Sequence, residues 1–301
     1  MEQGGVLVTP SRWRVWFLAS RPPTLPAAIV PVLVGTAVGV SESTFRPVVF
    51  VVALIASLLI QIGTNFANDL SDFHKGADTA ERLGPTRVTQ SGLITSSDLK
   101  RGIAVTFGLA LLFGLYLVYV GGWPIIVIGL LSILCGLAYT GGPWPLGYHG
   151  LGDVFVFIFF GLVAVIGSAY LQSGHVTLLA LLAAIPVGLL VTNILVINNL
   201  RDVETDKVAG KHTLAVLLGA RAVRFQYAIF SMAAYVIVPC LWYFGGSTLF
   251  VLLAWLTLPL SARLVDPVLG GLSGRPLNRV LKMTGQLHLL FGALLAIGLL
   301  L

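Results

Sequence analysis

Long apolar runs recur along the chain from residue 21 to residue 301, and short polar segments separate them. Each run is close to the ~20 residues that an α-helix needs to cross the hydrocarbon core of a bilayer. The pattern predicts nine membrane-spanning helices, at residues 21–40, 46–67, 102–121, 123–140, 151–171, 177–198, 223–243, 247–264 and 282–301. No polar segment is long enough to fold as a soluble domain, so we predict a single polytopic domain over residues 1–301, of the all-α transmembrane class.

The composition agrees with a membrane protein. Hydrophobic residues make up 57% of the chain and charged residues 10%, whereas about a quarter of the residues in a soluble domain are charged. Of the 18 lysines and arginines, only Arg46 falls in a loop on the second side of the membrane, so the net charge of +6 reflects topology rather than an anionic partner. By the positive-inside rule, the N-terminal segment 1–20 and the loops 68–101 and 199–222 are cytoplasmic.

Two polar clusters follow predicted helices on this cytoplasmic side. The stretch "NDLSDFHKGAD" spans residues 68–78, and "NNLRDVETD" spans residues 198–206. Each contains the spacing Asn-x-x-x-Asp. If the helices continue into the loops, paired carboxylates share one helix face, where like charges repel unless a cation lies between them. The pairs are Asp69 with Asp72 and Asp202 with Asp206.

The residue types in these loops point to a metal and a diphosphate. Carboxylate and amide oxygens without His or Cys nearby select Mg²⁺, or alternatively Mn²⁺ or Ca²⁺. Basic side chains in the same loops would bind phosphate oxygens. They are Lys75, Arg82, Arg87, Lys207 and Lys211. A hydrophobic bundle below such a site would hold a long apolar tail.

An allylic prenyl diphosphate fits this combination of groups. It ionises when metal ions and cationic side chains take up the charge on its leaving group. A cavity inside the membrane keeps water away from the resulting cation. Tyr139, Trp144 and Tyr148 are candidates to stabilise that cation through their ring faces, and an interfacial aromatic belt is the alternative interpretation for Trp144 and Tyr148.

The two clusters resemble the motifs of the UbiA-type intramembrane prenyltransferase family, which pairs NDxxDxxxD with DxxxD. Here the motifs read "NDLSDFHKGAD" and "DVETD". The resemblance implies nine transmembrane helices around a central cavity, two Mg²⁺ ions, and transfer of a polyprenyl group to an aromatic acceptor. The chain departs at one position, because the last aspartate of the family's first motif falls on Gly76, and Asp78 lies two residues further on.

The "KGAD" ending is similar to the branch of the family that acts on 1,4-dihydroxy-2-naphthoate in menaquinone and phylloquinone synthesis. The stretches "RPPTLPAAIVPVLVG", "RLGPTRVTQSGLI" and "YTGGPWPLGYHGLGDVFVFIFFG" resemble the same branch. This implies transfer of a polyprenyl group from polyprenyl diphosphate to the naphthoate, with loss of CO₂ and diphosphate, giving demethylmenaquinone. The expected partners are these two substrates and membrane lipid in a bacterial cytoplasmic membrane, with no nucleic acid and no obligate protein partner.

The resemblance also assigns roles to residues. The expected metal ligands are Asn68, Asp69, Asp72, Asp78, Asp202 and Asp206. The expected diphosphate-binding residues are Lys75, Arg82, Arg87 and Lys211, and the candidates for acceptor binding are Asn198, Asn199 and Arg21. The expected catalytic residues are Asp72, Asp202, Asp206 and Tyr139, with Asp206, Tyr139 or Asp153 handling the acceptor proton.

Two alternatives stay open at the level of sequence. An enzyme of the same family would prenylate another acceptor, such as 4-hydroxybenzoate, a chlorin or a haem. A divalent-cation transporter would need ionisable groups near mid-membrane, whereas the carboxylates of this chain gather at one face.

Overall fold

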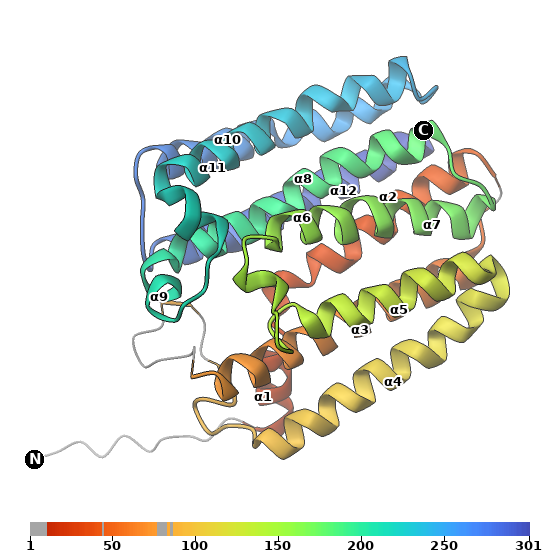
Figure 1. The fold of residues 1–301 in the computed structure, drawn as a ribbon. Coiled ribbons are helices and arrows are strands. Elements are labelled where there is room, and N and C mark those ends of the chain that lie inside the picture. The colour runs from red at the N-terminus through yellow and green to blue at the C-terminus, as the bar shows by residue number, and fades with distance from the viewer. Residues whose placement is uncertain (1–10, 44, 77–82, 85–86) are drawn as a thin grey trace, which may run out of the picture.

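The computed structural model describes residues 11–43, 45–76, 83–84 and 87–301, and helices are the only regular secondary structure in these ranges. Its α-helices are α1 Arg12–Ala19, α2 Pro26–Ser41, α3 Pro47–His74, α4 Ser96–Gly121, α5 Trp123–Ala138, α6 Gly152–Val156, α7 Ala164–Ser173, α8 Leu178–Arg201, α9 Val203–Val208, α10 Leu214–Tyr243, α11 Leu258–Leu269 and α12 Leu277–Leu300. Figure 1 shows the long helices side by side along a common axis, with α10 and α11 at one edge of the bundle and α4 at the other.

Seven segments of the described chain are long and apolar enough to cross a membrane. They are α3, α4, the segment Gly152–Ser173, α8, α10, the segment Leu249–Leu269, and α12. The pair α1–α2 makes an eighth if its 56° bend lies within one span, and α5 has only 16 residues. The predicted all-α transmembrane bundle is confirmed, and the helices at the first and fourth predicted spans, α2 and α5, have only 16 residues each.

The start of the first predicted span at residue 21 is wrong, because a break precedes α2. Pro22 and Pro23 open a short 3₁₀ turn, and α2 begins at Pro26. A proline ring has no N–H to donate and fits only the first turn of a helix without disrupting it. At the break, Arg21 has a φ of 51°, in the left-handed region that residues other than glycine seldom adopt.

Helix α8 lies at the centre of the bundle, where 72% of its most apolar window is buried. It packs against α2, α10, α12 and the π-helical stretch Phe157–Val163. Gly161 and Gly188 allow two backbones to meet here, because a Cβ on Gly161 would lie 2.6 Å from the Cα of Gly188. Such small residues let helices approach closely in lipid, where van der Waals packing drives their association.

The helices that carry the two motifs do not end where the sequence pattern places their ends. Helix α3 continues to His74, so the predicted loop start at residue 68 is wrong and the first cluster is helical as far as His74. The helix ends before Gly76, which has a φ of 64° and suits the left-handed position that terminates a helix. Helix α8 ends at Arg201, and the backbone turns at Asp202 into the short helix α9.

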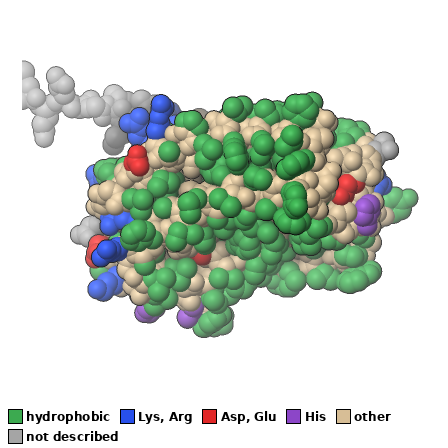
Figure 2. All heavy atoms as spheres, turned by 90° about the horizontal axis from the view of Figure 1, so that it is seen from above, with side chains coloured by type: hydrophobic (Ala, Val, Ile, Leu, Met, Phe, Trp, Pro, Cys, Tyr) green, Lys and Arg blue, Asp and Glu red, His purple; other side chains and the backbone are tan. Residues whose placement is uncertain are grey.

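Charged side chains gather at the end of the molecule that carries α9. Figure 2 shows most of the visible Lys and Arg side chains at this end and a broad hydrophobic surface between the two ends. Exposed leucine, valine and aromatic side chains lie along the outer helices α4, α5 and α10. A surface this apolar is suited to lipid rather than water, and the chain is an integral membrane protein.

Candidate active site

A cavity of about 640 Å³ lies inside the bundle and reaches the end that carries α9. Residues of both motifs line it, namely Asn68, Asp72, Asn198, Asn199, Asp202 and Asp206. Three of the predicted cationic residues line it as well, namely Arg21, Arg87 and Lys211. Most of the remaining wall is apolar and comes from α3, α4, α5 and the segment Gly152–Ser173. The structure therefore brings the two motifs, far apart in the sequence, to one cavity.

Asp72 is more enclosed than Asp69, the other described carboxylate of the first motif, with 1% of its surface exposed. Its Oδ2 accepts a hydrogen bond from Arg87 Nη2 at 2.7 Å, and its Oδ1 lies 3.2 Å from Lys211 Nζ. The hydroxyl of Tyr148 donates to the same Oδ1 at 2.9 Å. A buried carboxylate is stable when cations and donors satisfy its oxygens in this way.

Tyr148 has two lysines close to its ring at the mouth of the cavity. The Nζ atoms of Lys75 and Lys211 are 4.7 and 4.9 Å from the centre of its ring. Lys75 also donates to the backbone oxygen of Thr140 at 2.6 Å. Burial lowers the pKa of Lys75, and the charge of Lys211 lowers it further, whereas Asp72 opposes the shift. Lys75 does not line the cavity, so of the predicted diphosphate-binding lysines only Lys211 does.

The second motif is organised by a residue that sequence reasoning missed. Arg201 is 2% exposed and holds both carboxylate oxygens of Asp202, from Nε at 2.8 Å and from Nη2. Its Nη2 also donates to Asn198 Oδ1 at 2.9 Å. An arginine directly before an aspartate, at the end of an apolar helix, was the available signal, because a charge at such a position needs a partner.

Both motifs contribute an asparagine to the wall. Asn68 accepts a hydrogen bond from Thr140 Oγ1 at 2.8 Å. Asn199 is 8% exposed and lines the cavity one turn before Asp202. Asp206 comes from α9 and lines the same cavity.

Asp69 faces away from the cavity, so the structure does not support it as a metal ligand. Its carboxylate accepts hydrogen bonds from the backbone amides of Val88 at 3.2 Å and Thr89 at 3.4 Å. The side chain is 3% exposed, and it anchors the segment that follows Arg87. Spacing of three residues along a helix separates two side chains by about 60°, which is enough to turn Asp69 toward the loop while Asp72 points into the cavity.

Asp78 and Arg82, two predicted site residues, lie outside the described residues. Trp144 stacks on His149 with ring centroids 4.4 Å apart and does not line the cavity. Asp153 does not line it either, because its Oδ2 accepts a hydrogen bond from Gln226 at 2.6 Å.

Tyr139 marks the boundary between the charged mouth and the apolar interior. It follows α5 directly and lines the cavity. Burial raises the pKa of its hydroxyl above the ordinary value, and the carboxylates of Asp153, Asp206 and Asp72 raise it further. Its hydroxyl therefore stays protonated and is able to donate a hydrogen bond.

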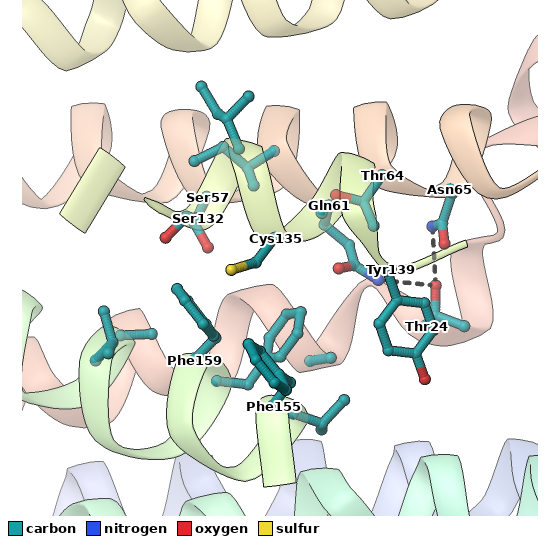
Figure 3. A pocket seen from close by; sticks show the side chains of 18 of the residues that line it. Thr24, Ser57, Gln61, Thr64, Asn65, Ser132, Cys135, Tyr139, Phe155 and Phe159 are labelled. Carbon is teal, nitrogen blue, oxygen red and sulfur yellow. Dashed lines mark hydrogen bonds between the residues drawn. The ribbon is translucent and has the colours of Figure 1, made fainter. Parts of the chain in front are cut away.

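Below this boundary the cavity has two unlike walls. Figure 3 shows Phe155 and Phe159 facing Ser132 and Cys135 of α5 across the cavity. The other wall is polar, which sequence reasoning missed. Asn65 Nδ2 and Gln61 Nε2 donate hydrogen bonds to Thr24 Oγ1 at 3.1 and 3.4 Å.

The spacing of polar residues along α3 was the signal for this polar wall. Residues 61, 65, 68 and 72 repeat every three or four positions within an apolar helix, and polar side chains in a membrane helix face the interior of the bundle.

The donor set at the mouth suits a hard divalent cation. Within the described ranges no three Asp, Glu, His or Cys residues are grouped closely enough to hold a metal ion by themselves. The wall instead offers carboxylate and amide oxygens from the two motifs. Mg²⁺ is usually bound by one or two carboxylates together with substrate phosphates, so these residues fit Mg²⁺ held jointly with a diphosphate.

Comparisons with known proteins agree with this architecture. The model of the UbiA prenyltransferase family matches residues 28–266. The chain is 40% identical over 294 residues to a 1,4-dihydroxy-2-naphthoate octaprenyltransferase of Escherichia coli, covering 93% of this chain and 94% of that one. It is 35% identical to the enzyme of the same name from Bacillus subtilis, covering 95% of this chain and 92% of that one.

A solved structure shares the fold. A UbiA homolog from Archaeoglobus fulgidus, bound to GPP and Mg²⁺, has a TM-score of 0.62 at 13% sequence identity, covering 93% of this chain and 99% of that one. The fold and the two-motif cavity define an integral membrane helical bundle with an oxygen-lined site at one end. By the family match over most of its length, this chain belongs to the UbiA prenyltransferase family.

Proposed function

We propose that the protein transfers a polyprenyl group from polyprenyl diphosphate to 1,4-dihydroxy-2-naphthoate. A carbon–carbon bond forms at the ring carbon that carries the carboxylate, and the bonds to diphosphate and to CO₂ break. Electrons balance without an oxidant when the product leaves as the quinol form of demethylmenaquinone. The 1,4-dihydroxy-2-naphthoate octaprenyltransferases that align over more than nine-tenths of the chain support this choice of acceptor.

One observation carries the proposal. A single cavity joins the oxygen donors and cations of both motifs to a long apolar interior. A charged head and an apolar tail would thus be bound in one continuous space. A transporter has no need of such an apolar compartment, and membership of the family sets that alternative aside.

In this proposal Asn68 and Asp72 hold one Mg²⁺ ion, and Asp202 and Asp206 hold a second. Bound there, Mg²⁺ would withdraw charge from the diphosphate leaving group. Mn²⁺ would substitute, since it prefers the same oxygen ligands.

The cationic side chains around Asp72 would bind the diphosphate oxygens. Arg87 and Lys211 hold that carboxylate in the free protein, and they lie on the wall that the diphosphate would occupy. Arg87 offers a planar fork that matches phosphate geometry, and Lys211 acts as a point charge. Arg82 and Lys75 remain predicted contacts of the diphosphate, and Asp78 remains a predicted metal ligand.

The aromatic acceptor would bind where the charged mouth meets the apolar interior. Asn198, Asn199 and Arg21 line the cavity and would offer partners for its carboxylate and hydroxyl groups. Tyr139 also lines the cavity, and its protonated hydroxyl would donate to the acceptor or orient it. The apolar walls exclude water, which would otherwise capture the allylic cation. We propose Asp206 or Tyr139 as the residue that handles the acceptor proton.

We also propose that the charged end faces the cytoplasm of a bacterial cell. The excess of lysine and arginine at the end that carries α9 supports this orientation. Both substrates' polar groups would then be reached from the cytoplasmic side.

The reaction is tested with purified full-length protein in detergent, polyprenyl diphosphate and Mg²⁺. We expect mass spectrometry to find the decarboxylated prenyl naphthoquinol, or its air-oxidised quinone, with 1,4-dihydroxy-2-naphthoate as acceptor. Removing the metal with EDTA should lower the rate by at least about 100-fold, because metal ions supply several kcal/mol of charge stabilisation. Added Mg²⁺ or Mn²⁺ should restore it.

Parallel reactions with 4-hydroxybenzoate separate the possible outcomes. Turnover of 4-hydroxybenzoate without turnover of the naphthoate would contradict the proposed acceptor and keep the prenyl transfer. A rate that EDTA leaves unchanged would contradict the metal assignment, whichever acceptor reacts.

A further inference from the structure

Asn278, in the first turn of α12, connects two parts of the site that are distant in the sequence. Its Oδ1 accepts a hydrogen bond from Arg201 Nη1 at 2.8 Å. Its Nδ2 donates to the backbone oxygen of Leu83 at 2.8 Å. Asn278 itself does not line the cavity. One amide therefore joins the second motif to the segment that follows the first.

Arg201 transmits this connection to a carboxylate of the cavity wall. The guanidinium uses Nε and Nη2 on Asp202 and Nη1 on Asn278. Its donors form a rigid planar fork, so fixing Nη1 also fixes the plane in which Asp202 is held. Without Asn278, Arg201 Nη1 would lose its partner, and only the contacts with Asp202 and Asn198 would hold the plane of the guanidinium.

The segment that follows the first motif, called the first loop below, covers the same guanidinium with its backbone at Gly84. A Cβ added to Gly84 would lie 2.7 Å from Arg201 Nη2 and 3.0 Å from Cζ, so the loop approaches the cation as closely as glycine permits. Arg201 and Asp202 have side chains that are 0% and 10% exposed. Such a buried ion pair is stable only when further hydrogen bonds satisfy its remaining donors, and Asn278 supplies one of them.

We propose that Asn278 is a positioning residue of the metal–diphosphate site, which sets the orientation of Asp202 through Arg201 and holds the first loop at Leu83. The inference rests on the proposed function, because it takes Asp202 as a ligand of the metal. Residues that orient metal ligands typically change metal affinity or activity by 10- to 100-fold when they are replaced. The effect of Asn278 should therefore appear in metal binding before any chemistry occurs.

The experiment measures Mn²⁺ binding to the full-length protein by electron paramagnetic resonance, with inorganic diphosphate present and no acceptor. For Asn278→Ala we expect Mn²⁺ affinity to fall by about 10-fold or more, with the KM for the acceptor unchanged in the transfer assay. The matched control is Lys282→Ala, one turn further along α12 at an exposed position, which should bind Mn²⁺ as the unmodified protein does. Asn278→Leu keeps the branching of the side chain without its hydrogen bonds, and it replaces the alanine variant if the latter does not fold.

The same substitution in an Asp202→Asn background tests whether Asn278 acts through Asp202. We expect Asn278→Ala to cause no further loss of Mn²⁺ affinity there, because the group that it positions is already altered. An equal loss in both backgrounds, or unchanged affinity in folded Asn278 variants, would overturn this inference and leave the proposed function standing. Absence of Mn²⁺ binding by the unmodified protein would overturn the proposed metal site itself.

Discussion

Replacing Asp72 with asparagine is expected to lower kcat for prenyl transfer by at least about 100-fold, the scale of losing one preorganised charge-stabilising contact. Asp72 is nearly fully buried and is the carboxylate on which Arg87, Lys211 and Tyr148 converge. An amide keeps the shape and the hydrogen bond from Tyr148. It loses the negative charge that the proposed metal requires and that holds the two cations in place.

The measurement must distinguish a loss of catalytic activity from unfolding of the variant. The substitution leaves two cations without their carboxylate, and breaking a buried ion pair costs about 3–5 kcal/mol, so we expect a lower melting temperature as well. Activity should be measured far below that temperature, on a variant that elutes as a single species. The control is Asp98→Asn at the start of α4, where the carboxylate is 47% exposed and pairs only at the surface. Loss in both variants, or activity retained by folded Asp72→Asn, would contradict the assignment.

The parts of this architecture that the sequence predicted are those that depend on local pattern. Apolar runs mark the membrane helices because every span must bury its backbone polar groups within itself. The repeated Asn-x-x-x-Asp spacing identified Asp72 and Asp202 because each lies at the charged end of an apolar helix. Both residues line the cavity.

The parts that the sequence did not predict depend on contacts between distant segments. Asn278 meets Arg201 and Leu83 across separations of 77 and 195 residues, and no local pattern in α12 identifies it. Asp69 fits the family motif as well as Asp72 does, yet the return path of the loop determines that it binds the amides of Val88 and Thr89.

The packing of α5 is a further feature that the sequence did not predict. Its predicted span over 123–140 satisfies hydropathy, but only Ile125 among its 16 helical residues is buried. The helix packs against α3 and α4 and forms one wall of the cavity. Hydropathy shows that α5 is apolar, but it does not show that few other helices pack against it.

This loosely packed wall leads to the second large expected effect, for Gly129→Trp in the middle of α5. Gly129 lines the cavity, and a Cβ placed there would meet no atom within 4 Å. Ile126 and Leu130 also line the cavity while remaining 44% and 49% exposed, so the space continues toward lipid at this helix. An indole at residue 129 would occupy room that a long polyprenyl chain needs and that a short one does not reach.

We expect Gly129→Trp to lower kcat/KM for a long polyprenyl diphosphate by about 10- to 100-fold, the range given by the 1–3 kcal/mol cost of overpacking. With dimethylallyl diphosphate the change should stay within about twofold, as for a substitution away from the reacting groups. The matched control is Gly108→Trp on α4, where a Cβ likewise meets no atom within 4 Å but the residue does not line the cavity. Equal losses for both chain lengths would indicate damage to the bundle, and no loss for the long chain would show that the tail does not pass α5.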